Sequence, residues 1–378
     1  MRLFLIAGEP SGDRLGAALM AGLGTLSPGV QFTGVGGPMM QRAGLESLFP
    51  MEELSVMGLV EVLPKYVALK RRIAQAAQAV LDSGAQALVT IDSPDFCLRV
   101  AAIVKAARPD FAVIHYVAPS VWAWRPGRAV KMARVVDHVL ALLPFEPPHM
   151  TAAGMSCDFV GHPVVAEALA SAEERALMAG DGPLILALPG SRKGEVARLA
   201  PVLGEVVGRI REVHVGVRVA LPTVRGVAGL VRELTAGWPV VPQIIEDAQV
   251  KRAAFAVADV AIAASGTVSL ELAANDCPMV IAYDMNPVTL WLMRRAALID
   301  TVTLVNLVSK TRVVPEFIGP ECRAEKIAPA VLRLLSEGGA SQRDAMRLTM
   351  ERLGRGGEPP GLRAAQSVLS FLAARGVA

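Results

Sequence analysis

Short apolar runs alternate along this chain with longer segments in which apolar residues recur at helical spacing. Most of these runs are largely apolar, which is typical of strands buried on both faces of a parallel sheet. The helical segments between them indicate βα units. The predicted strands are residues 3–7, 31–35, 87–91, 112–117, 138–141 and 157–159, then 184–188, 218–221, 240–245, 260–263 and 279–283. The main predicted helices are residues 14–26, 65–81, 97–107, 128–135, 323–336, 341–353 and 361–374.

The alternation breaks off once, over residues 161–183, where the sequence becomes helical and then rich in Gly and Asp. This break predicts a hinge between two α/β domains, each a Rossmann-like, doubly wound parallel sheet, facing one another across a ligand cleft. We expect the domains to span 1–165 and 183–320. For the C-terminal helices over 321–378, packing back onto the first domain and staying with the second are both open.

The composition is apolar and poor in charge, with 53% hydrophobic and 19% charged residues. Lys and Arg outnumber Asp and Glu by only 38 to 35, which argues against a nucleic-acid-binding protein with a large basic excess. The uncharged stretch 15–41 contains too many Gly and Pro residues for a membrane-spanning helix, and the apolar N-terminus stops at Glu9 without a signal-peptide cleavage site. We therefore expect a cytoplasmic protein, with any membrane contact being peripheral.

Cysteine and histidine spacings give no sign of a metal site. The four cysteines lack a CxxC pattern and the five histidines lack an HxxxH pattern. We expect neither a metal nor a bound cofactor.

Two carboxylates follow the first predicted strand, in Gly8-Glu-Pro-Ser-Gly-Asp13. Ligands of doubly wound sheets bind at the carboxyl ends of the strands, so these side chains are candidates for a site. Ser11 and Asp13 have two interpretations, as caps of a helix that begins near Arg14 or as acceptor-binding residues. Glu9 precedes a proline and has no capping task, which favours a functional role.

Asp92 directly follows the predicted strand 87–91. Ser93, Pro94 and Asp95 together form a local helix-start signal that needs no function to explain it. Asp92 lies one residue too early to belong to that signal. It is a candidate general base, and a purely local structural role is the alternative.

Residues 115–128 gather aromatic and basic side chains in a protein with only 4% aromatic residues. Trp122 and Trp124 suit half-buried pocket walls or a membrane interface. Arg125 and Arg128 supply donors for a phosphate or an anionic surface. A tryptophan pair in the core beside a solvated basic helix is an equally open alternative.

Two loops of the second half combine small residues with the start of a helix. The first, 188–195, carries Ser191 and the adjacent cation Arg192, an arrangement suited to a pyrophosphate. The second, 264–271, offers Ser265, Gly266 and Thr267 for backbone contacts, and Glu271 for either a ribose or the helix dipole. Together they favour a nucleotide diphosphate held without a structural metal.

Six motifs in this order resemble the lipid-A-disaccharide synthase family. They are Gly8-Glu-Pro-Ser-Gly-Asp13, Met51-Glu-Glu-Leu-Ser-Val-Met-Gly58, Ile91-Asp-Ser-Pro-Asp-Phe96, His115-Tyr-Val-Ala-Pro-Ser-Val-Trp-Ala-Trp-Arg125, Leu188-Pro-Gly-Ser-Arg192 and Ala264-Ser-Gly-Thr267.

The resemblance implies a GT-B fold and an inverting glycosyltransferase of Gram-negative lipid A biosynthesis. The implied reaction joins UDP-2,3-diacylglucosamine to 2,3-diacylglucosamine 1-phosphate (lipid X), giving a β-1,6-linked disaccharide 1-phosphate and UDP. The family's proposed base corresponds to Asp92 and its important glutamate to Glu9. The arginine of its phosphate loop corresponds to Arg192, and an asparagine near its cleft to Asn306.

Because both implied substrates are acylated, we expect residues 51–69 to meet the cytoplasmic face of the inner membrane, with Met57, Leu59 and Val60 in lipid. Core packing of a long helix is the alternative for this segment. Other functions left open are a UDP-sugar 2-epimerase, a peptidoglycan-type glycosyltransferase and a non-catalytic UDP-sugar-binding protein at the membrane. The sequence leaves the oligomeric state open.

Overall fold

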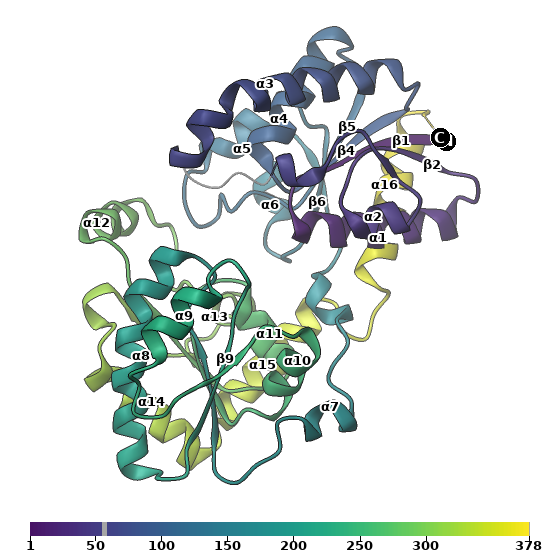
Figure 1. The fold of residues 1–378 in the computed structure, drawn as a ribbon. Coiled ribbons are helices and arrows are strands. Elements are labelled where there is room, and N and C mark those ends of the chain that lie inside the picture. The colour runs from purple at the N-terminus through teal and green to yellow at the C-terminus, as the bar shows by residue number, and fades with distance from the viewer. Residues whose placement is uncertain (55–58, 378) are drawn as a thin grey trace. The chain divides into compact units, whose positions relative to one another are not determined.

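The computed structural model describes the backbone of residues 1–54 and 59–377, and the side chains of residues 1–54 and 67–377. The chain forms two compact units, Met1–Ala166 with Gly356–Ala378, and Glu167–Arg355 (Figure 1). This division separates the C-terminal helices that the sequence groups together. Helices α14 (Ala324–Glu337) and α15 (Ala340–Arg352) lie in the second unit, and α16 (Pro360–Ala374) lies in the first.

The first unit is built on a seven-stranded parallel sheet in the order β3-β2-β1-β4-β5-β6-β7. The predicted strands are present, and the two-residue edge strand β3 is an addition that is too short to leave an apolar pattern. The strands are β1 Arg2–Ala7, β2 Gln31–Val35, β3 Glu46–Ser47, β4 Ala87–Ile91, β5 Ala112–Tyr116, β6 His138–Ala141 and β7 Ser156–Phe159.

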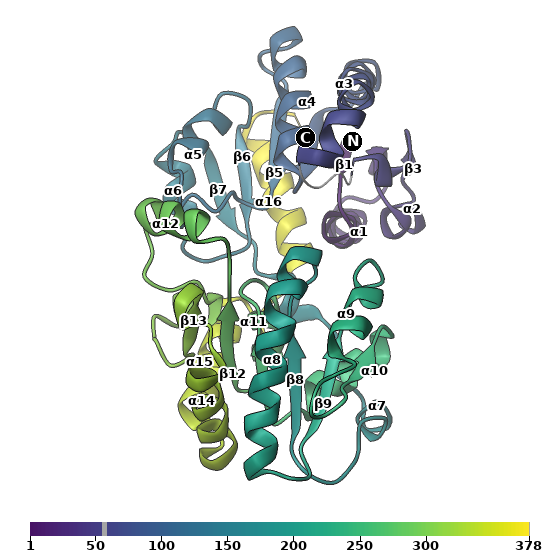
Figure 2. The same ribbon diagram turned by 60° about the vertical axis from the view of Figure 1, so that its left-hand side comes forward.

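Successive strand residues point to opposite sides of the sheet, and their apolar side chains are covered by helices on both faces. Phe4 and Ile6 pack with α3, α4 and α5, while Leu3 and Leu5 pack with α1, α2 and α16. The helices are α1 Pro10–Leu26, α2 Pro38–Arg42, α3 Leu59–Asp82, α4 Pro94–Ala107, α5 Gly127–Met132 and α6 Pro147–Thr151, with short 3-10 turns η1 Met51–Glu53 and η2 Pro163–Ala166. Figure 2 shows α16 running along the sheet.

The last helix is fixed to the first unit by close backbone contact and by polar bonds. A Cβ on Gly22 of α1 would lie 2.6 Å from the carbonyl oxygen of Gly361, so the two helices can approach only through glycine. Buried His138 of β6 lies 2.8 Å from Ser367 Oγ, and Ser367 Oγ donates to Asp158 Oδ2 at 2.6 Å. Burial lowers the pKa of His138.

The second unit repeats the design with a six-stranded parallel sheet in the order β10-β9-β8-β11-β12-β13. Its core lies between the sheet and α8, α9 and α14 on one face, and α11, α13 and α15 pack against one another. The strands are β8 Leu184–Leu188, β9 Arg218–Pro222, β10 Gln243–Ile245, β11 Val260–Ala263, β12 Met279–Tyr283 and β13 Glu316–Ile318. The helices are α7 Ala172–Ala176, α8 Lys193–Val213, α9 Ala228–Thr235, α10 Ala248–Val257, α11 Val268–Ala274, α12 Pro287–Ala296 and α13 Leu304–Ser309, with the 3-10 turn η3 Gly319–Glu321.

Both sheets reverse their strand order at one point, which confirms the predicted doubly wound fold. The reversal falls between β1 and β4 in the first unit and between β8 and β11 in the second. Crevices for ligands open at such switch points. Among the described residues, none of the helices combines the length and apolar character that crossing a bilayer requires.

Candidate functional site

At the switch point of the first unit, the motifs that follow β1 and β4 meet. Ser11 Oγ donates to Asp92 Oδ2 at 3.3 Å, although the two residues are 81 positions apart in sequence. Glu9 occupies the N-cap position of α1, and its side chain makes no capping bond there. The parallel pairing of β1 with β4 therefore brings the two predicted functional carboxylates to the same sheet edge.

The backbone around Asp92 is strained. Asp92 and Ser93 have φ values of 55° and 45°, and Val117, at the end of neighbouring β5, has a φ of 87°. Left-handed conformations cost energy for residues with a side chain, most of all for β-branched ones, and cluster at functional sites. A Cβ on Gly8 would lie 2.5 Å from Ser93 Oγ, so only glycine fits where β1 ends.

The interpretation of Ser11 and Asp13 as caps of a helix near Arg14 is wrong. Helix α1 begins at Pro10, because proline is favoured in the first turn, so both residues lie inside it. Asp13 is buried and serves α2 instead, accepting bonds from the backbone N–H groups of Gly37, Met39 and Met40 at 2.9 to 3.0 Å. Both of its carboxylate oxygens are thus occupied by a neighbouring helix, and only Ser11 faces Asp92.

Trp122 is half-buried and held in place by a buried carboxylate. Its Nε1 donates to Glu146 Oε1 at 3.2 Å, and its ring meets Phe145 edge to face with centroids 5.0 Å apart. Glu146 also accepts from the backbone N–H groups of Leu142 and Leu143. Burial of Glu146 outweighs these hydrogen bonds and raises its pKa to about 7.

Trp124 is also half-buried, and two arginines lie over its ring. The guanidinium carbons of Arg125 and Arg128 are 4.1 and 5.6 Å from the ring centroid. Arg125 is exposed and has a left-handed backbone, with φ of 52°. The two indoles therefore line the surface of the unit rather than forming a core pair, which leaves the pocket-wall or interface interpretation.

The described residues of the predicted lipid-contacting segment, 51–69, lie in different environments. Met51 and Leu54 are buried in the core, so they are not available to a membrane, while Val67 is exposed. Arg72 pairs with Glu53 at 2.7 Å. Met57 and the side chains of Leu59 and Val60 lie outside the described residues.

At the switch point of the second unit, a cavity of about 440 Å³ opens between the loops that follow β8 and β11. Ligand pockets are commonly of this size. Six of the seven residues predicted for the nucleotide sugar line it, namely Ser191, Arg192, Ser265, Gly266, Thr267 and Glu271. Glycine is needed at Gly190, which has a φ of 102° and approaches Glu195 closely.

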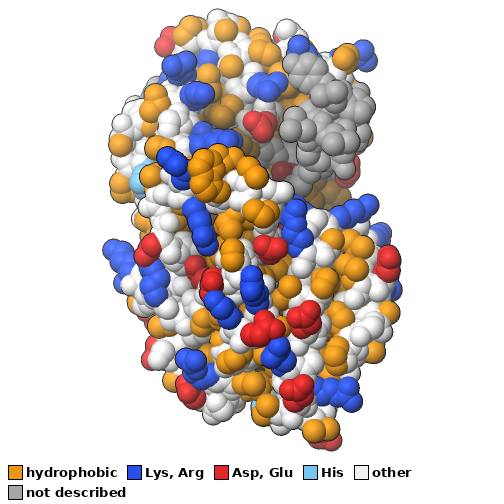
Figure 3. All heavy atoms as spheres, turned by 90° about the vertical axis from the view of Figure 1, so that its left-hand side faces the viewer, with side chains coloured by type: hydrophobic (Ala, Val, Ile, Leu, Met, Phe, Trp, Pro, Cys, Tyr) orange, Lys and Arg blue, Asp and Glu red, His pale blue; other side chains and the backbone are white. Residues whose placement is uncertain are grey.

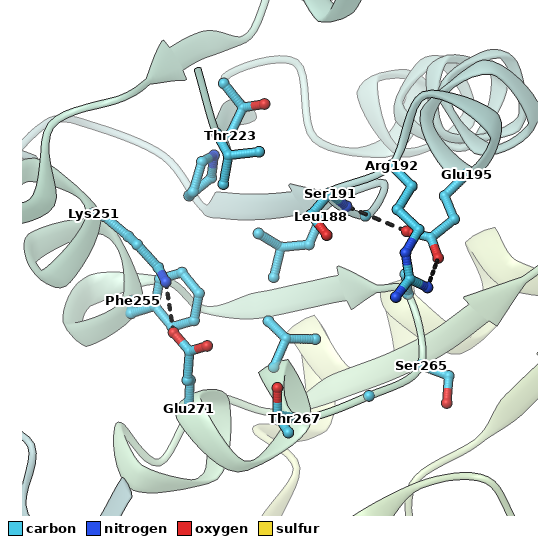
Figure 4. A pocket seen from close by; sticks show the side chains of 16 residues that line it. Leu188, Ser191, Arg192, Glu195, Thr223, Lys251, Phe255, Ser265, Thr267 and Glu271 are labelled. Carbon is cyan, nitrogen blue, oxygen red and sulfur yellow. Dashed lines mark hydrogen bonds and ion pairs between the residues drawn. The ribbon is translucent and has the colours of Figure 1, made fainter. Parts of the chain in front are cut away.

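Two ion pairs lie at opposite ends of this cavity (Figure 4). At one end, Glu195 accepts from Arg192 Nη1 at 3.2 Å and from the backbone N–H of Ser191 at 3.3 Å, which orients the loop. At the other end, Lys251 Nζ lies 2.6 Å from Glu271 Oε2. Glu271 therefore has a specific cationic partner beyond the helix dipole.

Asn306, the seventh predicted residue, lies away from the cavity lining. It is buried in α13, where its amide nitrogen donates to Thr301 Oγ1 and to the carbonyl oxygen of Val314. Its Oδ1 accepts from the backbone N–H of Val314. In this structure Asn306 joins α13 to the segment before β13, and a nucleotide contact by it stays a prediction.

The chain matches the lipid-A-disaccharide synthetase family over residues 3–358. It belongs to that family. Relatives include lipid-A-disaccharide synthases of Ruegeria pomeroyi, 61% identical over 98% of this chain and 96% of the relative, and of Rhodospirillum centenum, 46% identical over 100% and 96%. The predicted family, and with it a glycosyltransferase of lipid A biosynthesis, is thereby confirmed.

Solved structures similar to this synthase family member confirm the predicted GT-B fold. The UDP-GlcNAc 2-epimerase of Neisseria meningitidis aligns with a TM-score of 0.67 at 10% identity, covering 99% of this chain and 100% of the epimerase. MurG of Acinetobacter baumannii aligns with a TM-score of 0.52 at 15% identity, covering 99% of each chain. At such identities the similarity concerns the fold alone.

The sequence did not single out several other residues that line this cavity, among them Glu195, Thr223, Lys251 and Phe255. Thr223 could have been found from the sequence, because it directly follows β9. In the structure its buried Oγ1 has no hydrogen-bond partner among the described residues. Lys251 and Phe255 lie one helical turn apart on α10. Nothing local distinguishes them from an ordinary helix surface.

Proposed function

We propose that this protein transfers a 2,3-diacylglucosaminyl group from UDP to the 6-hydroxyl of 2,3-diacylglucosamine 1-phosphate, forming a β-1,6 linkage with inversion. The observation that carries the proposal is the cavity at the β8/β11 switch point. It combines an arginine, small-residue loops and the N-terminus of α8, which suits the diphosphate of a nucleotide sugar.

Asp92 is the general base of this proposal. The acceptor O6 gives its proton to the Asp92 carboxylate and forms a bond to the anomeric carbon, while the bond from that carbon to the β-phosphate oxygen breaks and UDP leaves with the electron pair. Hydrogen bonds from Ser11 Oγ and from the backbone N–H of Ser93 orient the two carboxylate oxygens. Glu9, at the same sheet edge, orients the acceptor or shares the proton path.

Arg192 and the backbone amides of the two loops stabilise the charge that develops on UDP. Glu195 holds Arg192 in the cavity, so the guanidinium is oriented before the substrate arrives. Glu271, which pairs with Lys251, accepts hydrogen bonds from the ribose hydroxyls in this proposal.

We further propose that the protein works in the cytoplasm and binds the inner membrane peripherally. Both substrates carry acyl chains, and Trp122, Trp124 and Arg125 lie at the surface of the first unit. Met57, Leu59 and Val60 complete the lipid contact in this proposal. Polar substitution of Leu59 and Val60 should weaken vesicle binding, and unchanged binding would remove this segment from the account.

The reaction is tested by supplying both acylated glucosamines and analysing the products by mass spectrometry. We expect the disaccharide 1-phosphate only when both substrates are present. Conversion of the UDP-sugar to an epimer without lipid X, or no product at all, would contradict the proposal.

Asp92→Asn tests the base, because it keeps the shape of the side chain and removes its ability to take a proton. We expect turnover to fall about 100- to 10,000-fold, the usual contribution of a general base. Asp95→Asn, in the exposed first turn of α4, is the matched control and should retain turnover.

A further inference from the structure

Helix α12 of the second unit has a well-defined start, but it buries little of its surface against the rest of the unit. Its start is specified by Asn286, whose Oδ1 accepts from the backbone N–H of Val288 at 2.9 Å, and by Pro287 in the first turn. Within α12, all of which the structure describes, Leu290 is the only buried residue. Leu290 packs on Gly319, where a Cβ would collide with it.

The apolar stripe of α12 faces solvent. Val288, Trp291 and Leu292 are 66%, 57% and 55% exposed, and together with Arg295 they occupy positions i, i+3, i+4 and i+7 of one helix face. A surface helix normally turns such a stripe towards the core. Leu298, just beyond the helix, extends the exposed apolar surface at 60%.

Within the segment that carries this stripe the charged residues are all basic, and the nearby acidic residue Glu321 lies on the 3-10 turn η3, where Lys326 and Arg294 lower its pKa. Arg294 and Arg295 end the helix, and residues 285–299 contain no acidic residue. The guanidinium carbon of Arg295 lies 5.1 Å from the centroid of the Trp291 ring. Figure 3 faces the side on which α12 lies in Figure 1 and shows apolar side chains gathered there beside basic ones.

We infer that the α12 stripe, Val288, Trp291, Leu292 and Arg295, docks on an anionic lipid surface. Tryptophan and aliphatic side chains on one face, flanked by arginines, are the composition of helices that lie in the membrane interface. The arginines at the end of the helix match the charge of an anionic headgroup layer, which favours a lipid surface as the occupant. The inference rests on the proposed function, because an acylated nucleotide sugar must reach the second unit from a bilayer.

The test compares Trp291→Ser/Leu292→Ser with the wild type in sedimentation with vesicles of phosphatidylethanolamine and phosphatidylglycerol. The control is Val215→Ser/Val241→Ser, which removes two exposed apolar side chains of the same unit outside the stripe. We expect the stripe variant to partition at least about tenfold more weakly, since two apolar side chains no longer enter the interface. Arg294→Gln/Arg295→Gln should lose about fivefold per arginine on these vesicles and little on phosphatidylcholine.

Partitioning of the stripe variant equal to that of the control would overturn the inference. So would a wild-type dimer that the stripe variant converts to monomers by light scattering, because the occupant is then a second copy. A fall in melting temperature in the stripe variant without loss of vesicle binding would also overturn it, since the stripe is then covered by the protein itself. Activity on detergent-dispersed substrates separates the two proposals: the stripe variant should keep it, whereas an inactive wild type refutes the proposed reaction alone.

Discussion

Replacing Glu146 by glutamine should change how the stability of the protein depends on pH. Glu146 is only 4% exposed and accepts bonds from Trp122 Nε1 and from two backbone N–H groups. Burial raises its pKa from 4.5 to about 7. Glutamine fills the same space and cannot take up or release a proton in this range.

The direction and magnitude of this effect on the free energy of unfolding follow from proton linkage. Between pH 4.5 and 7 the folded protein binds a proton at Glu146 that the unfolded chain has already released. The stabilisation is therefore fully present below pH 4.5 and is lost as the pH rises through about 7. A difference of 7 minus 4.5, at about 1.4 kcal/mol per pH unit, amounts to roughly 3.5 kcal/mol in the free energy of unfolding.

The assay is urea unfolding of both proteins at about pH 5 and about pH 8. Buried His115 and His162, whose pKa values are lowered to about 4, give the opposite pH dependence in both proteins. The difference in free energy of unfolding between wild type and Glu146→Gln isolates the carboxyl group. Between about pH 5 and about pH 8, the wild type should lose most of that roughly 3.5 kcal/mol relative to the glutamine variant. A difference that does not vary with pH would refute the reasoning. Exposed Glu212→Gln is the control.

Three further substitutions follow from the site. Asp13→Ala should lower the free energy of unfolding by about 3 kcal/mol or more in thermal or urea melts, because three N–H groups at the start of α2 lose their acceptor; an unchanged melt would contradict this. Arg192→Ala should raise the KM for the UDP-sugar about 10- to 100-fold in steady-state kinetics, through lost charge-assisted bonds, while exposed Arg209→Ala should leave it unchanged. Gly8→Ala should destabilise the first unit, and Ser93→Gly should restore its melting temperature by removing the clashing side chain; failure of that rescue would count against the close approach.

Much of the fold could be predicted because its central strands are buried on both faces and leave apolar runs. The short edge strands β3 and β13 escaped because two or three half-exposed residues leave no periodicity. The start of α1 was placed too late, since Ser11 and Asp13 look like local caps. The real partner of Asp13 is the start of α2, which lies 24 residues along the chain and has no local trace at Asp13.

The site was predictable where it is made by strand ends and obscure where helices supply it. Glu9, Asp92, Arg192 and the 264–267 loop all follow strands, and the sheet order brings them together in pairs at the two switch points. Lys251 reaches the cavity only because α10 packs beside β8. In the same way, an apolar run such as 288–293 does not reveal whether it faces the core or solvent.

The most direct test of the central claim is the structure of the product formed from UDP-2,3-diacylglucosamine and lipid X. Proton NMR of the isolated disaccharide, with UDP quantified in the same reaction, reports both the linkage and the anomeric configuration. The account predicts a β-1,6 bond and one UDP released per disaccharide. An α linkage, or UDP released without a disaccharide, would contradict it.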